Sequence, residues 1–245
     1  MSDTFQIAWR IHHKTETAST NLDARAGTHG DVFTADFQTA GRGRLDHKWL
    51  SPPGTNLMMS VVLSVKGLAP DHVATLPLVA GLAVVQSLSS LIPHPSSLKW
   101  PNDVLVGGKK IAGILCERHG DNVIVGIGVN VNQTAFTPEI ADRATSLALV
   151  SSNLVSRLSS SVIAVRAAIL RELDGLYSLW HSKGFAAVYP AIVAIDHLKG
   201  LKISVRQTDD DSAPLTGVSN GIMPDGTLDV GGAKVFAGEA HVESL

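Results

Sequence analysis

The chain has 245 residues, which is enough for one large domain or for a medium and a small one. Its hydrophobic fraction of 44% and charged fraction of 17% are typical of a folded protein and exclude an intrinsically disordered chain. Because the net charge is −2, no global basic field recruits nucleic acid or an anionic membrane, so a nucleic-acid role would need a local patch.

The N-terminal part of the chain predicts strands separated by a helix start and a loop. Residues 5–11 (FQIAWRI) have a strand-like composition, and residues 19–26 (STNLDARA) are typical of a capped helix start. Residues 31–39 predict a strand that ends at a Gly/Arg loop, residues 40–55. Residues 56–65 are apolar almost throughout, so they predict a central strand.

The middle of the chain predicts a helix, two paired strands and a second helix. Residues 69–91 predict a core helix and not a membrane span, because proline, glycine, glutamine and several serines interrupt their apolar run. Residues 99–117 and 121–133 predict adjacent strands of one sheet with a turn between them. Apolar residues at steps of three and four predict an amphipathic helix over about 156–182.

The residues after about 196 are short alternating runs separated by DDDS, PDG and VGG. Asp225-Gly226 indicates a hairpin. Short strands over the last fifth of the chain predict a small β-barrel appended to a larger α/β domain. We therefore divide the chain into residues 1–195 and residues 196–245.

Two features indicate a cytoplasmic protein. Cys116 is the single cysteine and cannot form an internal disulfide, which suits a reducing compartment. The N-terminal residues are polar and mixed, without the basic and then apolar order of a signal peptide.

Generic catalytic motifs are missing from the sequence. GRGRLD at 41–46 and GIGVNV at 126–131 each lack the third glycine of a dinucleotide fingerprint, and GGKKIAG lacks the spacing of a P-loop. The scattered histidines and single cysteine make a zinc site a poor hypothesis, and no Gly-x-Ser-x-Gly elbow is present.

Polar segments at strand ends are the remaining candidates for chemistry. Residues 18–21 (ASTN) offer hydroxyls and an amide to a small polar ligand, although an ordinary helix cap explains them too. Gln38 precedes the cationic loop 41–44 (GRGR), where glycines allow close approach and arginines can clamp phosphate; a solvated surface loop is the alternative. Residues 99–103 (KWPND) could hold a metal-bound phosphate or form a simple turn. The glycines of residues 126–132 (GIGVNVN) fit close packing against a ligand or a helix.

Two adjacent lysines pose a question that alternation leaves open. In a strand, Lys109 and Lys110 point to opposite faces, and both faces continue into apolar residues. One of the two ammonium groups therefore lies near a buried or cleft-lined surface, where a bound carboxylate or phosphate would serve as its partner.

Taken together, these segments resemble the catalytic core of biotin protein ligases. The matching stretches are STN, FQTAGRGR, KWLSPPGTNL, KWPNDV, KKIAGIL and GIGVNVN, in the order of the family, over about residues 16–150. Residues after 196, ending GEAHV, are similar to the small C-terminal SH3-like barrel of that family. The resemblance implies an α+β fold, in which a class II synthetase-like mixed β-sheet is flanked by helices and followed by that barrel.

The resemblance also implies substrates and site residues. Biotin would react with ATP and Mg²⁺ to give biotinyl-5′-AMP and pyrophosphate, and a lysine of a biotin carboxyl carrier protein would then displace AMP. The implied biotin-binding residues are Ser19, Thr20, Asn21, Gln38, Arg42, Gly43, Arg44, Lys110 and Gly113. The implied ATP-binding residues are Arg42, Arg44, Asn102, Asp103, Lys110 and Asn130. Lys110, Arg44 and Asp103 would be catalytic, with Asp103 also binding Mg²⁺, and the match leaves Lys109 as a turn residue.

Two departures from the family pattern carry expectations. The loop commonly continues GRGRRGR, whereas Leu45-Asp46-His47 follows Arg44 here, so we expect the adenylate to be held less tightly. Fewer than twenty residues precede STN, which leaves no room for the helix-turn-helix domain of bifunctional members. We therefore expect a ligase without operator-binding activity and without a membrane partner. A homodimer is one option for the oligomeric state.

Three other functions compete with this interpretation. A lipoyl or octanoyl transferase shares the general fold, although GRGR with KWPND favours biotin. A regulator could bind biotin without releasing pyrophosphate. A nucleic-acid-binding module would use the small barrel and the arginine loop, but the net acidity and the lack of interleaved aromatic residues argue against it.

Overall fold

In a computed structural model, which describes residues 6–45, 47–150, 161–207 and 213–243, seven strands form one mixed sheet. The strands are β1 (Arg10–Thr17), β2 (Asp31–Gln38), β3 (Leu57–Ser64), β4 (Ser96–Lys99), β5 (Asp103–Val106), β6 (Lys109–His119) and β7 (Asn122–Val129). Their order is β1-β2-β3-β7-β6-β5-β4, with β1 and β2 parallel and the other neighbours antiparallel. The mixed sheet flanked by helices is therefore confirmed; β3 lies in its interior and β6 and β7 are neighbours, both as predicted.

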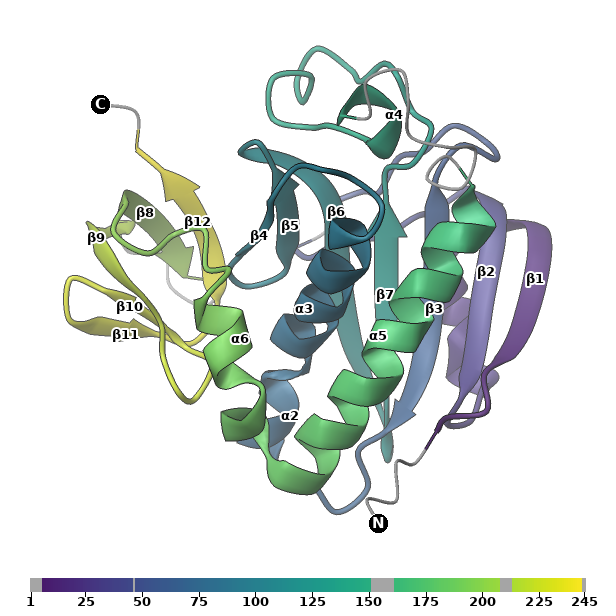
Figure 1. The fold of residues 1–245 in the computed structure, drawn as a ribbon, viewed down its shortest axis with the longest axis horizontal. Coiled ribbons are helices and arrows are strands. Elements are labelled where there is room, and N and C mark those ends of the chain that lie inside the picture. Colours follow the sequence, from purple (N-terminus) through teal and green to yellow (C-terminus); the bar gives the residue numbers. More distant parts are fainter. Residues whose placement is uncertain (1–5, 46, 151–160, 208–212, 244–245) are drawn as a thin grey trace.

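Helices cover both faces of this sheet. The helical elements are α1 (Thr20–Asp23), α2 (Pro70–Ala74), α3 (Leu76–Ser89), α4 (Leu147–Val150), α5 (Val162–Lys183) and α6 (Tyr189–Val193), with 3₁₀ turns η1 (Ala24–Ala26) and η2 (Phe185–Ala187). The long helices α3 and α5 lie side by side across one face (Figure 1). The short α1 packs against β2, β3 and β7 on the opposite face. That opposite face carries the candidate site.

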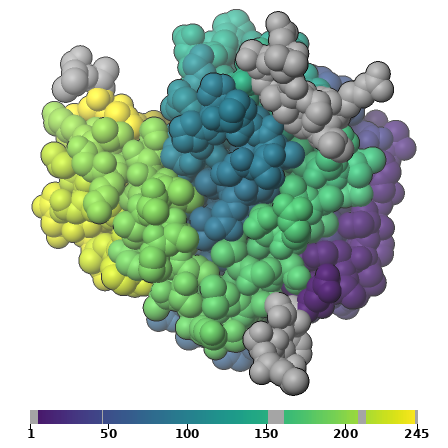
Figure 2. Space-filling model, in the orientation of Figure 1, coloured from purple at the N-terminus to yellow at the C-terminus, as the bar shows by residue number. Residues whose placement is uncertain are grey.

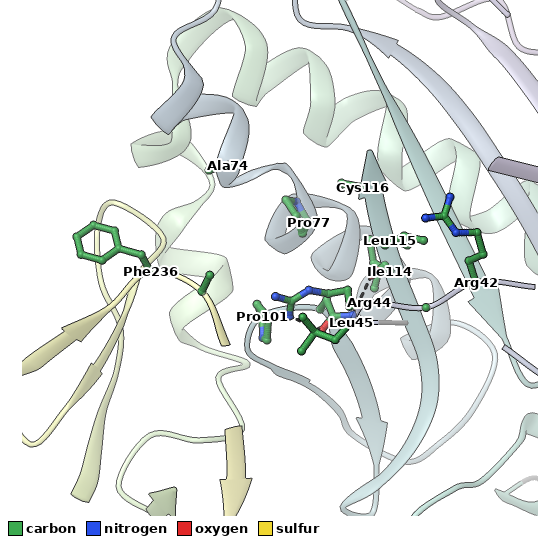
Figure 3. Close-up of a pocket in the computed structure, with 13 residues that line it drawn as sticks. Arg42, Arg44, Leu45, Ala74, Pro77, Pro101, Ile114, Leu115, Cys116 and Phe236 are labelled. Carbon is green, nitrogen blue, oxygen red and sulfur yellow. Dashed lines mark hydrogen bonds between the residues drawn. The ribbon is translucent and has the colours of Figure 1, made fainter. Parts of the chain in front are cut away.

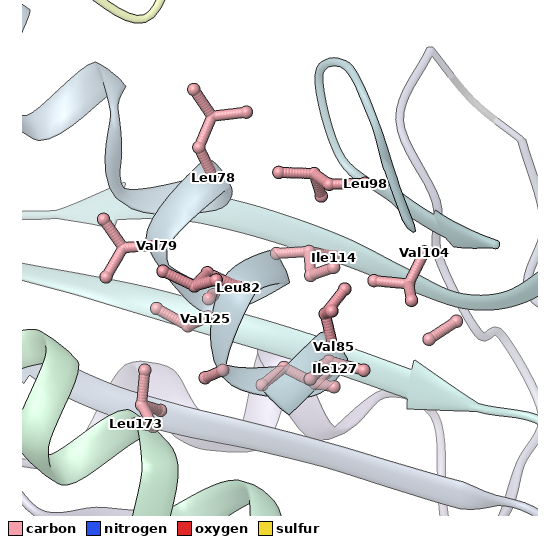
Figure 4. Packing of buried hydrophobic residues seen from close by; sticks show 14 of the residues in the cluster. Leu78, Val79, Leu82, Val85, Leu98, Val104, Ile114, Val125, Ile127 and Leu173 are labelled. Atoms are coloured by element: carbon pink, nitrogen blue, oxygen red, sulfur yellow. The ribbon is translucent and has the colours of Figure 1, made fainter. Parts of the chain in front are cut away.

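The main core lies between the sheet and helices α3 and α5. Val125 and Ile127 of β7 meet Leu82 of α3, and Leu173 of α5 closes the same cluster (Figure 4). Each of these side chains is at most 2% exposed. Burying an aliphatic side chain of this size stabilises the fold by about 1.5–3 kcal/mol, so this cluster holds the strands of the site rigid.

The C-terminal residues form a second, antiparallel sheet. Its strands are β8 (Lys202–Gln207), β9 (Leu215–Ile222), β10 (Leu228–Val230), β11 (Ala233–Val235) and β12 (Gly238–Val242), in the order β11-β10-β9-β8-β12. The predicted hairpin at Asp225-Gly226 is confirmed, because it joins β9 to β10. Among the described residues the sheet is open, so closure into an SH3-like barrel stays a prediction.

The C-terminal residues pack against the rest of the molecule, and the two parts form one continuous surface (Figure 2). Trp100 Nε1 donates to Gly226 O at 3.1 Å, and Tyr189 Oη donates to Ile222 O at 2.9 Å. Ile203 and Leu228 of the second sheet belong to the same buried cluster as the main core. The proposed boundary at residues 195 and 196 stays a prediction.

Four element predictions need correction. The strand predicted over 99–117 divides into the antiparallel strands β5 and β6. The strand predicted over 5–11 begins only at Arg10: residues 6–9 are irregular, and Ile7 and Trp9 pack on the core. The true edge strand β1 is polar because its side chains are exposed. The helix predicted over 69–91 divides at Thr75 into α2 and α3. The strand predicted over 121–133 ends at Val129.

The remaining helix predictions are confirmed in outline. Helix α5 matches the amphipathic pattern predicted over 156–182, although residues 156–160 lie outside the described part of the chain. By length and composition alone, Pro70–Ser89 could cross a membrane, with a mean hydropathy of 1.5 over its most apolar window. Because 67% of that window is buried inside the protein, the core-helix prediction is confirmed.

Candidate active site

All twelve residues singled out by the sequence line one cavity with a volume of about 560 Å³. They are Ser19, Thr20, Asn21, Gln38, Arg42, Gly43, Arg44, Asn102, Asp103, Lys110, Gly113 and Asn130. They come from segments far apart in the sequence, and the fold brings every one of them together. A cavity of this volume is typical of a small-molecule site.

Glycines in the two central strands make room for the cavity. Gly126 and Gly128 of β7 alternate with Val125 and Ile127, which point into the core on the other side. Gly113 of β6 is paired with Gly128. A Cβ atom on Gly128 would lie 2.6 Å from the Trp49 indole, so only glycine leaves space for that ring. The close-packing interpretation of GIGVNVN is therefore supported.

A β-bulge decides the orientation of the two lysines. Opposite β5, Val104 pairs with Ala112 but Leu105 pairs with Lys110, so Ile111 is an extra residue in β6. The extra residue turns Lys110 to the same face as Gly113, where an added Cβ would lie 3.3 Å from Lys110 Nζ. Lys109 is exposed at the start of β6 and does not line the cavity.

Lys110 faces a carboxylate inside the cavity. Its Nζ lies 2.7 Å from Asp103 Oδ1, and the Asp103 side chain is 21% exposed. The two groups form an ion pair, and Asp103 Oδ1 is buried without a further hydrogen-bond partner among the described residues. An oxygen in that state is available to a bound cation or to a substrate donor.

One end of the cavity is a buried polar network. Gln38 Oε1 accepts from Thr20 N at 2.8 Å and from Thr20 Oγ1 at 3.1 Å. Ser60 Oγ lies 2.7 Å from Thr20 Oγ1 and 2.6 Å from Asn21 Oδ1. Ser19 occupies the N-cap position of α1, yet its side chain makes no capping hydrogen bond. The helix-cap explanation for Ser19 is therefore not supported, and its hydroxyl is available to a ligand.

The arginine loop closes the cavity between two anchors. Arg42 Nη1 donates to Glu117 Oε1 of β6 at 3.0 Å. Arg44 Nη1 donates to Gly238 O at 3.2 Å and to Asn102 Oδ1 at 3.4 Å. The two guanidinium groups point in opposite directions (Figure 3). Burial lowers the pKa of Arg44, although Asp103 opposes this shift.

The side chains of Asn102 and Asn130 are held in place by hydrogen bonds to backbone carbonyl groups. Asn102 Nδ2 donates to Ile114 O at 2.9 Å, and Ile114 N donates to Asn102 O at the same distance. Asn130 Nδ2 donates to Thr145 O at 3.0 Å. Both residues line the cavity, and both are held in place by neighbouring strands or loops.

The cavity also contains residues that the sequence did not single out as site residues. Among them are Trp49, Lys99, Arg143, His197 and Glu239, the last from strand β12. Burial lowers the pKa of Lys99, and the nearby carboxylates Asp103 and Glu239 partly offset this effect. The lysine of KWPND was a visible signal for Lys99, whereas nothing in the sequence marked β12 as part of the site.

A second, smaller cavity of about 360 Å³, shown in Figure 3, shares Arg44 with the first in its lining. It is lined by Arg44, Pro77, Pro101 and the single cysteine, Cys116. Burial raises the pKa of the Cys116 thiol to about 12, so the thiol is protonated at neutral pH. The Cys116 thiol is therefore a weak nucleophile in this cavity at neutral pH.

Comparisons with known sequences connect this geometry to one family. The chain matches the Biotin/lipoate A/B protein ligase family over residues 9–133. It is 35% identical over 243 residues to the biotin–[acetyl-CoA-carboxylase] ligase of Mycobacterium tuberculosis, covering 94% of this chain and 87% of the relative. It is 37% identical over 150 residues to the bifunctional ligase/repressor BirA of Bacillus spizizenii, but that match spans only 46% of the relative.

Solved structures agree along nearly the whole chain. The biotin protein ligase from Aquifex aeolicus in complex with biotin and ATP superposes with a TM-score of 0.84 at 30% identity, covering 96% of this chain and 99% of that one. Its apo structure gives a TM-score of 0.81 at 26% identity. The sequence and structural matches together show that this chain belongs to the Biotin/lipoate A/B protein ligase family, among its biotin ligases, and is a ligase enzyme.

Proposed function

We propose that the protein activates biotin as biotinyl-5′-AMP and transfers it to a lysine of a biotin carboxyl carrier protein. The observation that carries this proposal is the placement of the Lys110–Asp103 pair and the Thr20–Asn21–Gln38 network in one cavity. The related Aquifex aeolicus structure, which holds biotin and ATP, supports the choice of substrates.

In the first step, a carboxylate oxygen of biotin attacks the α-phosphorus of ATP, and the bond to the β-phosphate bridging oxygen breaks to release pyrophosphate. In the second step, a neutral lysine amine attacks the biotinyl carbonyl carbon, the bond to the AMP oxygen breaks and the amine loses its proton. Negative charge develops on phosphate oxygens in both steps. The ammonium of Lys110 and the guanidinium of Arg44 stabilise that charge without acting as nucleophiles.

At the other end of the cavity, Ser19, Asn21 and Gln38 hydrogen-bond the ureido ring of biotin. Thr20 positions Gln38, since both of its donors already reach Gln38 Oε1. Asn102 and Asn130 hold the nucleotide side, and their side-chain amides are fixed by hydrogen bonds to Ile114 O and Thr145 O. Gly113 leaves room for the ligand.

The site fits a magnesium ion. Asp103 Oδ1 is buried without a hydrogen bond among the described residues, and magnesium typically takes one or two carboxylates, with phosphate oxygens and water as further ligands. The described residues contain no cluster of three His, Cys, Asp or Glu side chains that could hold a metal. When bound, the ion would neutralise charge on the phosphates.

The remaining predictions are part of the same proposal. We infer a cytoplasmic enzyme whose second sheet is the SH3-like module of the family, with no DNA-binding repressor activity. Mobility-shift assays on operator DNA and sedimentation velocity test the absence of DNA binding and the homodimer option.

The departure in the arginine loop gives a prediction of its own. Leu45 and His47 are described, whereas Asp46 lies outside the described residues. We expect the variant Leu45→Arg/Asp46→Gly/His47→Arg to release biotinyl-adenylate more slowly than the parent, because it adds two cations beside the phosphate. A release rate in the parent no faster than in the variant would contradict this expectation.

The substrate is tested by incubating the protein with ATP, Mg²⁺, an acceptor carrier domain and either labelled biotin or labelled lipoate. We expect biotin, and not lipoate, to become linked to the carrier lysine, as read by mass spectrometry. Labelling by lipoate alone would favour the lipoyl branch of the family and overturn the proposal.

A further inference from the structure

Glu117 is a carboxylate outside the cavity lining that contacts both the polar network and the arginine loop. It lies in β6 with its side chain 22% exposed. Its Oε2 accepts from Asn21 Nδ2 at 2.6 Å, and its Oε1 accepts from Arg42 Nη1 at 3.0 Å. Arg25 Nη2 lies 3.7 Å from the same Oε1. One side chain thus joins two parts of the site through different oxygens.

The contact with Asn21 determines which way the Asn21 carboxamide points. A carboxylate only accepts hydrogen bonds, so the amide nitrogen of Asn21 must face Glu117. Its Oδ1 consequently faces Ser60 Oγ at 2.6 Å and lies over Gly126. Asn21 is 4% exposed, so a reversed amide would leave a buried donor and acceptor mismatched.

The contact with Arg42 holds the start of the arginine loop. Arg42 is exposed and extends away from Arg44, towards β6 (Figure 3). Its side chain makes an ion pair with Glu117, and this contact is shorter than the one between Arg25 and the same carboxylate. A neutral side chain at position 117 would remove this attraction and release the loop on that side.

We propose that Glu117 is a positioning residue that couples the orientation of Asn21 to the placement of the Arg42 loop. In this arrangement the Arg42 loop is already placed over the position that the substrate occupies when it binds against Asn21. This inference rests on the proposed function, because it takes biotin as the ligand at Asn21. Glu117 itself touches no reacting atom.

The test is the affinity for biotin alone, measured by isothermal titration calorimetry. We expect Glu117→Gln to weaken biotin binding by about tenfold or more, since the neutral amide loses the charge-assisted hydrogen bonds to Asn21 and Arg42. Glu117→Asp, which keeps the acceptor-only carboxylate, should lose less affinity than Glu117→Gln. An Asp variant that binds biotin more weakly than the Gln variant would contradict a role for the charge.

A matched control removes an equal charge elsewhere. Glu172→Gln on α5 breaks the ion pair with Arg171 and should leave biotin affinity unchanged. Thermal unfolding of each variant checks the fold, and a midpoint within about 2 °C of the parent shows that a loss of binding is local. A Glu117→Gln protein that binds biotin like the parent would overturn the inference.

Double-mutant cycles separate the two arms of the coupling. In an Asn21→Ala background and in an Arg42→Gln background, we expect Glu117→Gln to cost less affinity than it does in the parent. Equal losses in all three backgrounds would show a general structural effect and refute the coupling. A parent protein that binds no biotin would refute the proposed function, an outcome distinct from a parent that binds biotin with Glu117→Gln unchanged.

Discussion

At the scale of single residues, the insertion of Ile111 in β6 determines which lysine enters the cavity. Strict alternation would place Lys110 opposite Gly113, whereas the bulge places both on one face. The sequence supplies both lysines and the apolar residues around them, but no local pattern marks the bulge, because the pairing partner in β5 creates it. Resemblance to a family identified Lys110 where strand periodicity left the choice open.

Gly128 gives a test of the close packing in the cavity. We expect Gly128→Ala to weaken biotin binding by about tenfold or more, because its Cβ would displace the Trp49 ring and overpacking costs about 1–3 kcal/mol. Gly175→Ala on α5 is the matched control, since no atom lies within 4 Å of its added Cβ. The control should stabilise the protein by about 0.5–1 kcal/mol and leave binding unchanged. Equal biotin affinity in Gly128→Ala and the parent would contradict this packing.

At the scale of elements, the sequence predicts strands well where burial is symmetric and poorly at the edge. The apolar runs of β3 and β7 are visible because both faces of those strands are covered. Strand β1 is missed because its polar sequence, RIHHKTET, suits an exposed edge. Ile7 and Trp9 have the composition of a strand, but they anchor the irregular segment before β1 on the core. Ile7 N donates to Asp174 Oδ1 at 2.8 Å in this segment.

Helix α5 gives a prediction about stability. We expect Leu173→Ala to lower the free energy of unfolding by about 2–5 kcal/mol, because Leu173 is fully buried between α5 and the sheet. Ile163→Ala on the same helix should change it by no more than about 0.5 kcal/mol, since Ile163 is 66% exposed. Denaturant unfolding measures both variants. Similar losses in the two would show that α5 does not pack as described.

At the scale of the whole molecule, the second sheet takes part in the site. Glu239 and His241 of β12 line the cavity, and Arg44 donates to Gly238 O at the start of that strand. The sequence patterns predict that the C-terminal residues form an appended module, and they predict no site residues within it. Such a contribution depends on how the two sheets pack, and side chains from both share one core.

The molecule also contains a histidine-rich aromatic cluster that predicts acid sensitivity. Burial lowers the pKa of His29, and the nearby charges of His181 and Arg10 lower it further. Burial also lowers the pKa of His72; His181 adds to this effect, whereas Asp71 and a backbone hydrogen bond oppose it. The fold therefore favours the neutral imidazoles, so their stabilising contribution is complete above the unfolded pKa of about 6.5 and is lost as the pH falls below it. His72 stacks on Trp180 with ring centroids 4.3 Å apart.

We expect the free energy of unfolding to fall as the pH is lowered from about 7.5 to about 5.5. His72→Phe keeps an aromatic ring on Trp180 but cannot take up a proton, so its loss over the same interval should be smaller. Chemical denaturation at each pH measures the difference. A variant with the same pH dependence as the parent would show that His72 does not contribute.

The central claim, that Lys110 serves adenylate formation in this cavity, is tested most directly by biotin-dependent pyrophosphate release in the presence of ATP and Mg²⁺. We expect the parent protein to release pyrophosphate only when biotin is present. Lys110→Ala should release it about a hundredfold to a thousandfold more slowly, as expected when a charge-stabilising group is removed. A Lys110→Ala protein that matched the parent, or a parent that bound biotin and released no pyrophosphate, would contradict the account.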